Sequence, residues 1–125
     1  MNEIPLKERT KPQPKNIYAL DETKLTALRE YLVENLREGF VRPSKSSAGY
    51  PIHFVPNKNG KLRLWVDYRQ LNDITDKNSY PLPLISESRD RLQGKKYFTT
   101  VYLKGAYNLI RTKKGEEWKT AFRTR

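Results

Sequence analysis

The sequence predicts an α+β fold with an antiparallel or mixed sheet, formed by a single domain. Leucines recur at helical spacing within residues 21–39, and two β-type runs lie on either side of Asn59-Gly60. Further strand-like runs follow at residues 97–103 and 118–124. Helix and strand signals are therefore mixed along 125 residues, a length that suits one small domain with one core.

The first element expected is an arm, and the second is a helix. Residues 1–20 hold three prolines and four basic residues without periodicity, which predicts an extended, basic, proline-rich arm. Residues 21–39 predict a helix with Asp21 as its N-cap and Gly39 as its C-cap. Leucines on one face of this helix are expected to pack into the core: Leu25, Leu28, Leu32 and Leu36.

A β-hairpin is expected next. Its first strand contains Ile52, Phe54 and Val55, and Asn59-Gly60 is a strong signal for the connecting turn. In the second strand apolar and other residues alternate strictly. Leu62, Leu64 and Val66 are expected to face inward, which leaves Lys61, Arg63 and Trp65 on a basic and aromatic outer face.

The rest of the chain predicts one more helix and more strands. Residues 79–94 begin extended because of their prolines and then form a short helix that ends at Gly94. Residues 97–103 read as a buried strand that breaks at Gly105, and residues 118–124 read as a last strand. Because the sequence stops on strand-like residues, we expect a piece of a larger domain, able to self-associate through an open sheet edge.

Composition favours an anionic partner. The chain has 25 Lys and Arg against 14 Asp and Glu, a formal net charge of +11, which attracts polyanions such as nucleic acid. A soluble basic protein without such a partner is the alternative. With no cysteine, disulfides and thiolate metal sites are excluded. No secretory signal or membrane-spanning run is visible, so we expect an intracellular protein, cytoplasmic or nuclear, without a membrane partner.

Several segments together resemble the reverse transcriptases of gypsy-class LTR retrotransposons, which are part of Pol polyproteins. The resemblance covers roughly residues 24–125 and implies a partial right-hand polymerase fold with an incomplete sheet. The fingers would occupy about residues 21–93 and the start of the palm about residues 94–125. The segments that carry it are "EGFVRPSKSSAGYPIHFVPNKNGKLRLWVDYRQLND", "KNSYPLPLI", "DRLQGKKYFT" and "LKGAYNLIRTKKGEEWKTAFRTR".

The resemblance implies two-metal phosphoryl transfer with Mg²⁺ held by three aspartates. One aspartate belongs to a Leu-Asp-Leu-Lys-Gly-Ala-Tyr motif, which residues 101–107 match except that Val101 and Tyr102 occupy the first two positions. A phenol is neutral at pH 7 and a weak metal ligand, and residues 95–115 contain no acid that substitutes for it. The other two aspartates belong to a Tyr-x-Asp-Asp motif that is absent from residues 1–125. We therefore expect no catalytic residue, no metal ligand and no bound cofactor in this chain.

Other family positions keep suitable residues. The resemblance implies that Arg63 contacts the triphosphate of an incoming nucleotide, that Lys58 and Lys61 lie near its γ-phosphate, and that Tyr107 lies under its sugar. The alternatives are a solvated hairpin tip for the cations and a core position for Tyr107. Template phosphates are expected to meet a loop that contains Arg42, Ser44, Lys45 and Ser46.

Two further expectations are structural. Asp67 and Arg69 are expected to form a pair that ties the hairpin to the segment after it, and His53 is expected to pack rather than to bind a ligand.

Three hypotheses about function remain open. In the first, the chain is a truncated reverse transcriptase fragment without catalysis. In the second, it is a nucleic-acid-binding module derived from polymerase fingers. In the third, it is part of a working enzyme whose remaining palm lies on other sequence. Duplex affinity that weakens steeply with salt distinguishes the second hypothesis.

Overall fold

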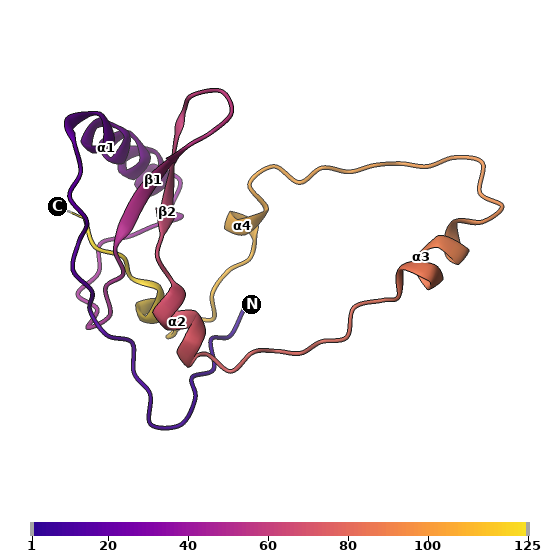
Figure 1. The fold of residues 1–125 in the computed structure, drawn as a ribbon, viewed down its shortest axis with the longest axis horizontal. Helices are drawn as coiled ribbons and strands as arrows, with labels where there is room; N and C mark the ends of the chain where they lie inside the picture. The colour runs from indigo at the N-terminus through magenta and orange to yellow at the C-terminus, as the bar shows by residue number, and fades with distance from the viewer. Residues whose placement is uncertain (1, 125) are drawn as a thin grey trace.

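The computed structural model describes residues 2–124, which form a body and an outer lobe (Figure 1). We define the body as residues 2–76 and 111–124 and the outer lobe as residues 77–110. Body elements are α1 (Glu22–Arg37), β1 (Ile52–Pro56), β2 (Leu62–Val66), α2 (Arg69–Ile74) and a 3-10 helix η1 (Glu117–Thr120), and the lobe contains α3 (Ile85–Leu92) and α4 (Ala106–Leu109). The predicted α+β class is confirmed. Within residues 2–124, no helix combines the length and the apolar character needed to cross a membrane.

The N-cap of α1 is the predicted residue, whereas its C-cap lies one residue before the predicted Gly39. The Asp21 carboxylate accepts a hydrogen bond of 2.8 Å from the backbone N–H of Lys24, which confirms the N-cap. Glu38 is the C-cap residue, and Gly39 follows it with φ +72°. The N–H groups of Gly39 and Phe40 donate to carbonyls of the last turn, the Schellman arrangement that only a left-handed residue closes easily.

The leucine stripe of α1 is buried at its middle and exposed at its end. Leu28 is 4% exposed and packs on the inner face of the hairpin, with Leu32 partly buried beside it. Leu36 is 45% exposed, so its predicted core position is wrong. The two-stranded sheet reaches the middle of the helix but not its last turn, where the buried side chain is Asn35, bonded to the Tyr31 carbonyl at 2.8 Å.

The predicted hairpin is confirmed in position and in facing. β1 and β2 pair antiparallel with Ile52 opposite Val66 and Phe54 opposite Leu64. The inner-face residues are buried or half-buried, whereas Arg63 and Trp65 are exposed. The connecting loop closes through Gly60, whose φ is +78° and whose N–H donates to the Asn57 carbonyl at 2.9 Å.

The body holds two small clusters of buried side chains that Val66 contacts in common. One contains Leu28, Ile52 and Phe54 between α1 and the sheet. The other contains Ile4, Ala48, Tyr50 and Leu71, which come from the arm, from the segment before β1 and from α2.

The arm contains no helix and no strand among its described residues, and it is part of the packed body. Ile4 is 9% exposed within the second cluster. Its N–H donates to Glu116 at 2.6 Å, and its carbonyl accepts from the Lys119 ammonium at 2.8 Å. Backbone hydrogen bonds also join the arm to residues 74–76 and to residues 111–113. The arm therefore holds together the two ends of the outer lobe (Figure 1).

Two predicted strands do not form. Residues 97–103 contain no strand and no buried residue, because no other described segment lies beside them to complete a ladder. Residues 118–124 contain the end of η1 and a single bridge between Tyr50 and Phe122 instead of a strand. The helix α2 was not predicted: it has only six residues, and Tyr68 before it supplies no side-chain cap.

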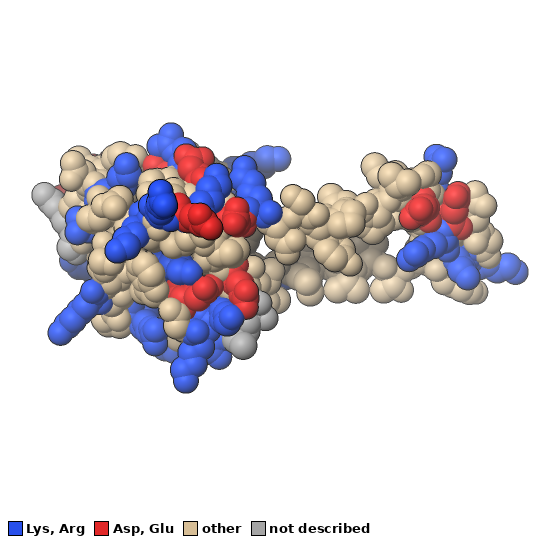
Figure 2. All heavy atoms as spheres, turned by 90° about the horizontal axis from the view of Figure 1, so that it is seen from below, with Lys and Arg blue, Asp and Glu red and all other residues tan. Residues whose placement is uncertain are grey.

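The outer lobe exposes a large apolar surface. The helix predicted before Gly94 forms as α3, yet every residue of the lobe is exposed. Tyr80, Leu82, Tyr97, Tyr102 and Tyr107 are each more than 80% exposed. Figure 2 shows charged side chains at the far end of the lobe, where α3 lies, and an uncharged stretch between α3 and the body.

The unequal burial of the leucine stripe predicts unequal costs of truncation. We expect Leu28→Ala to lower the free energy of unfolding by about 2–4 kcal/mol, because it leaves a cavity between α1 and the sheet. Leu36→Ala is the matched control and should cost less than about 1 kcal/mol, since that side chain is largely in water. Urea unfolding followed by tryptophan fluorescence measures both, and equal costs would contradict the packing described here.

Candidate nucleic-acid interface

The outer face of the hairpin carries cationic and aromatic side chains in register. Because side chains alternate along a strand, Arg63 and Trp65 of β2 share this face, opposite Val55 and His53 of β1 respectively. Trp65 is 53% exposed, and the Arg63 side chain is also exposed. A large exposed aromatic next to a guanidinium offers base stacking beside a phosphate contact.

The loop between β1 and β2 adds two lysines to the outer face, at the loop end of the hairpin. The side-chain oxygens of Asn57 and Asn59 accept the backbone N–H groups of Lys58 and Lys61, at 2.9 and 3.2 Å. These bonds fix the loop backbone, and both lysine side chains project into solvent. Lys58, Lys61 and Arg63 thus extend one positive strip from the loop along β2.

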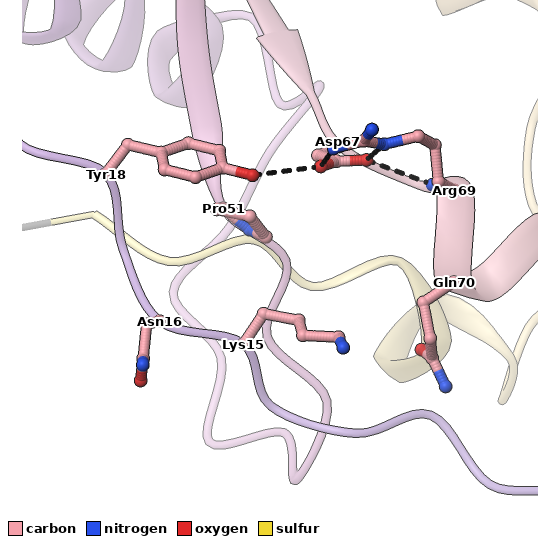
Figure 3. Close-up of a pocket in the computed structure, with 7 residues that line it drawn as sticks. All are labelled: Lys15, Asn16, Tyr18, Pro51, Asp67, Arg69 and Gln70. Carbon is pink, nitrogen blue, oxygen red and sulfur yellow. Dashed lines mark hydrogen bonds and ion pairs between the residues drawn. The ribbon is translucent and has the colours of Figure 1, made fainter.

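The near end of the face is built by Tyr18 of the arm. Its ring lies edge-on to His53, with centroids 6.2 Å apart. Its hydroxyl donates to the Asp67 carboxylate at 3.2 Å, just beyond the end of β2 (Figure 3). His53 therefore packs, as expected, and its neighbour comes from a segment that lies far away in the sequence.

Asp67 and Arg69 form the predicted pair. The Arg69 guanidinium donates to both Asp67 oxygens, at 2.9 and 2.7 Å, and the Arg69 backbone N–H donates to the same carboxylate at 3.2 Å. These bonds, with the smaller contribution of Tyr18, hold the pKa of the Asp67 carboxyl well below its usual range, although burial opposes them. The same side-chain hydrogen bond raises the pKa of Arg69. The carboxylate side chain is 10% exposed and the arginine 82% exposed, so the pair presents its cationic side to solvent.

A pocket opens next to this pair. Its other lining residues are Lys15, Asn16 and Tyr18 of the arm, Pro51 and Gln70. The Gln70 carbonyl oxygen accepts the Tyr50 hydroxyl at 3.0 Å, and the Lys15 ammonium reaches across the opening toward Gln70 (Figure 3). Ammonium, guanidinium and amide groups around one open hollow suit an anion.

The loop expected to meet template phosphates is tied to η1. The Ser46 hydroxyl donates to the Trp118 carbonyl at 2.6 Å and accepts the Ala48 N–H, so its role in the structure is to fix the loop. The Arg42 guanidinium lies 3.9 Å from Glu117 and is 76% exposed, and Lys45 is exposed. Arg42 also contributes to lowering the pKa of Glu117, after the larger effect of backbone hydrogen bonds.

Tyr102 and Tyr107 lie apart from this surface. They are 91% and 95% exposed in the outer lobe, so Tyr107 is not a core residue. Figure 1 shows α4, which contains Tyr107, standing away from the hairpin that carries Arg63. The structure therefore does not bring the hairpin cations together with these two tyrosines.

A catalytic Mg²⁺ ion would need several carboxylate oxygens gathered at one place. Within residues 2–124, no three His, Cys, Asp or Glu side chains gather where they could hold a metal ion. Tyr102 presents an exposed phenol, and the hard divalent cation prefers carboxylate oxygens.

Sequence reasoning missed Tyr18, Lys15 and Gln70. Their positions depend on the arm crossing next to the end of β2, about fifty residues away, and no local pattern encodes that contact. The one available signal was the apolar residue pattern of the arm, in which Ile4 packs as a core residue.

Comparisons of the sequence with a protein family and with curated proteins point to reverse transcriptases and transposon polyproteins. Residues 55–125, more than half of the chain, match the family described as "Reverse transcriptase (RNA-dependent DNA polymerase)". Over 121 residues, 97% of the chain, the sequence is 41% identical to the Transposon Tf2-3 polyprotein and, to the same extent, to the Tf2-4 polyprotein of Schizosaccharomyces pombe. The chain spans 9% of the length of each polyprotein.

One solved structure supports the fold. A crystal structure of Prototype Foamy Virus Protease-Reverse Transcriptase (CSH mutant) is similar with a TM-score of 0.54 and 20% identity, over 64% of this chain and 11% of that one. The predicted partial polymerase fold is thereby confirmed.

The lowered pKa of Asp67 predicts a pH-dependent stability. Above about pH 4, the pKa of an unfolded aspartate, the ionised carboxylate contributes its full stabilisation, and that contribution is lost as the pH falls toward the folded-state pKa. We expect Asp67→Asn to cost about 1–2 kcal/mol at pH 7 and progressively less below pH 4. Asp76→Asn, at an exposed site, is the control, and urea unfolding from pH 7 to pH 2.5 is the measurement. A cost that stayed constant over this range would refute the ionic role.

Proposed function

The chain belongs to the reverse transcriptase (RNA-dependent DNA polymerase) family, and we propose that it is the fingers and first palm segment of a gypsy-class enzyme, binding nucleic acid without catalysing polymerisation. The observation that carries the binding part is the outer face of the hairpin, where exposed Trp65 and Arg63 continue into Lys58 and Lys61. The similarity to Tf2 retrotransposon polyproteins supports the gypsy-class origin.

The proposed binding of nucleic acid uses two kinds of contact, one with phosphates and one with bases. The positive strip of the hairpin neutralises phosphates, which supplies affinity that is independent of base sequence. Trp65, with Tyr18 and His53 at its side, stacks an unpaired base of a template strand. Arg42 and Lys45 contact the backbone of the same strand farther from the hairpin. Lys15 and the cationic side of Arg69 border a hollow for one of its phosphates.

The absence of catalysis rests on Tyr102. A chain in which this phenol replaces the first metal-binding aspartate lacks the charge that would hold Mg²⁺ against the α-phosphate. We propose that Arg63, Lys61, Lys58 and Tyr107 are retained from a nucleotide site that this chain does not complete. The alternative is a non-catalytic nucleic-acid-binding module derived from the polymerase fingers, and this alternative predicts that Tyr102→Asp does not restore incorporation.

Binding is tested with fluorescent primer-template duplexes that carry a single-stranded template overhang. We expect an affinity that falls steeply between 50 and 200 mM salt, and a further loss of about tenfold for Arg63→Ala and for Trp65→Ala. Arg29→Ala, on the exposed side of α1, is the matched control for loss of one charge and should change affinity little. No measurable duplex affinity at low salt would exclude the binding role.

Catalysis is tested by restoring the carboxylate. We expect no Mg²⁺-dependent primer extension by residues 1–125 fused to the segment that follows the matched region in the Tf2-3 polyprotein. In the same chimera, Tyr102→Asp should raise incorporation by at least about a hundredfold, because it restores a charged metal ligand. Tyr97→Asp adds the same charge in the same segment and is the control. Incorporation by the unaltered chimera would contradict the role assigned to Tyr102.

A further inference from the structure

The segment of the outer lobe at residues 97–103, "YFTTVYL", has an unusual combination of composition and environment. It consists of β-branched, aromatic and other apolar residues and contains no charge, no proline and no glycine. Uncharged segments of about seven such residues pair readily with copies of themselves when they are exposed. The intrinsic preference of this segment is therefore a strand, although it forms none in the structure.

Both the backbone and the side chains of this segment lack partners. None of its backbone N–H or carbonyl groups forms a backbone hydrogen bond with another described residue. Tyr97 and Tyr102 are 92% and 91% exposed, and Phe98, Val101 and Leu103 are each more than 60% exposed. The segment therefore combines an unpaired strand edge with exposed apolar side chains, and such an edge is a template for pairing with another strand.

We propose that residues 97–103 form an intermolecular sheet with the same residues of a second copy of this chain. The two strands run antiparallel about a two-fold axis at Thr100. This register places Phe98 of one copy opposite Tyr102 of the other and Tyr97 opposite Leu103. Aromatic and apolar cross-strand pairs of this kind stabilise an antiparallel ladder, and alternate residues of each strand exchange backbone hydrogen bonds with the other copy.

The charges at the borders of the segment set its register and its salt dependence. Lys96 lies opposite Lys104 of the other copy, so one like-charge pair closes each end of the ladder. A slip of the register would carry a lysine into the uncharged centre. Because added salt screens this repulsion and that between two chains of formal charge +11, association strengthens with salt. Nucleic-acid binding weakens with salt, so the two activities are separable.

Tyr102 is the residue that makes the segment uncharged. A carboxylate at this position would replace the aromatic partner of Phe98 across the ladder, twice in each dimer, and would abolish both aromatic cross-strand pairs. The replacement of an acid by tyrosine therefore has a second consequence besides the loss of a metal ligand: it removes the charge that would oppose pairing of this strand.

The proposed dimer is tested by measuring the mass of the protein in solution as its concentration rises. Sedimentation velocity between 1 and 100 μM should show a weight-average mass that rises from monomer toward dimer, and rises further at 300 mM than at 50 mM salt. Tyr102→Asp should raise the dissociation constant at least tenfold. Tyr80→Asp makes the same change at an exposed aromatic outside the segment and should leave the constant within about twofold. A monomer at every concentration, or an equal loss for both variants, would overturn the proposal.

The register is tested by cysteine, which the natural chain lacks. Thr100→Cys places two thiols directly opposite each other, at the ~4.5–5.5 Å Cα separation of an antiparallel pair, which a disulfide accepts. With oxidised glutathione, this variant should form covalent dimers at least tenfold faster than Thr99→Cys, whose thiol lies opposite Val101. Equal rates for the two variants would exclude a ladder centred on Thr100. Neither result bears on the proposed nucleic-acid binding, which is tested separately by the salt dependence of duplex affinity.

Discussion

Tyr50 is the residue through which the parts of the body are connected. Its side chain is fully buried, its hydroxyl is bonded to Gln70 of α2, and its ring lies edge-on to Tyr68 at 5.3 Å. Its backbone N–H and carbonyl pair with Ala121 and Arg123, while Gly49 just before it accepts a hydrogen bond from the arm. Gly49 leaves room for the Arg123 side chain, which a Cβ would meet at 2.6 Å. Four segments that are distant in sequence therefore meet at one buried aromatic, and the hairpin extends outward from this point.

The sequence predicted the elements that are stabilised locally. The Asp21 cap and the alternation of β2 each depend on residues a few positions apart, and each was confirmed. The strands predicted at residues 97–103 and 118–124 failed because a strand needs a neighbouring backbone, which its own sequence does not specify. For the same reason, the cations and Trp65 of the outer face could be predicted by alternation, whereas Tyr18, held there through Asp67 and His53, could not.

The structure separates two groups of residues that the sequence predicted to share one nucleotide site. The cations of the hairpin are fixed by a packed body, and their position does not depend on the outer lobe. Tyr102 and Tyr107 lie on a lobe without internal packing, where local openings cost little free energy. The hairpin cations and these two tyrosines thus lie on parts of the chain that differ greatly in how well they are packed.

The attachment of the arm at both ends of the outer lobe has a topological consequence. Residues 74–76 and 111–113 are bonded to the same arm, so the lobe leaves the body and returns to it at one place. The closure entropy of such an excursion changes by only about 0.6 kcal/mol when its length doubles. The lobe therefore occupies an insertion point, where sequence can be added, removed or exchanged while the hairpin, α1 and the cluster around Tyr50 keep their contacts.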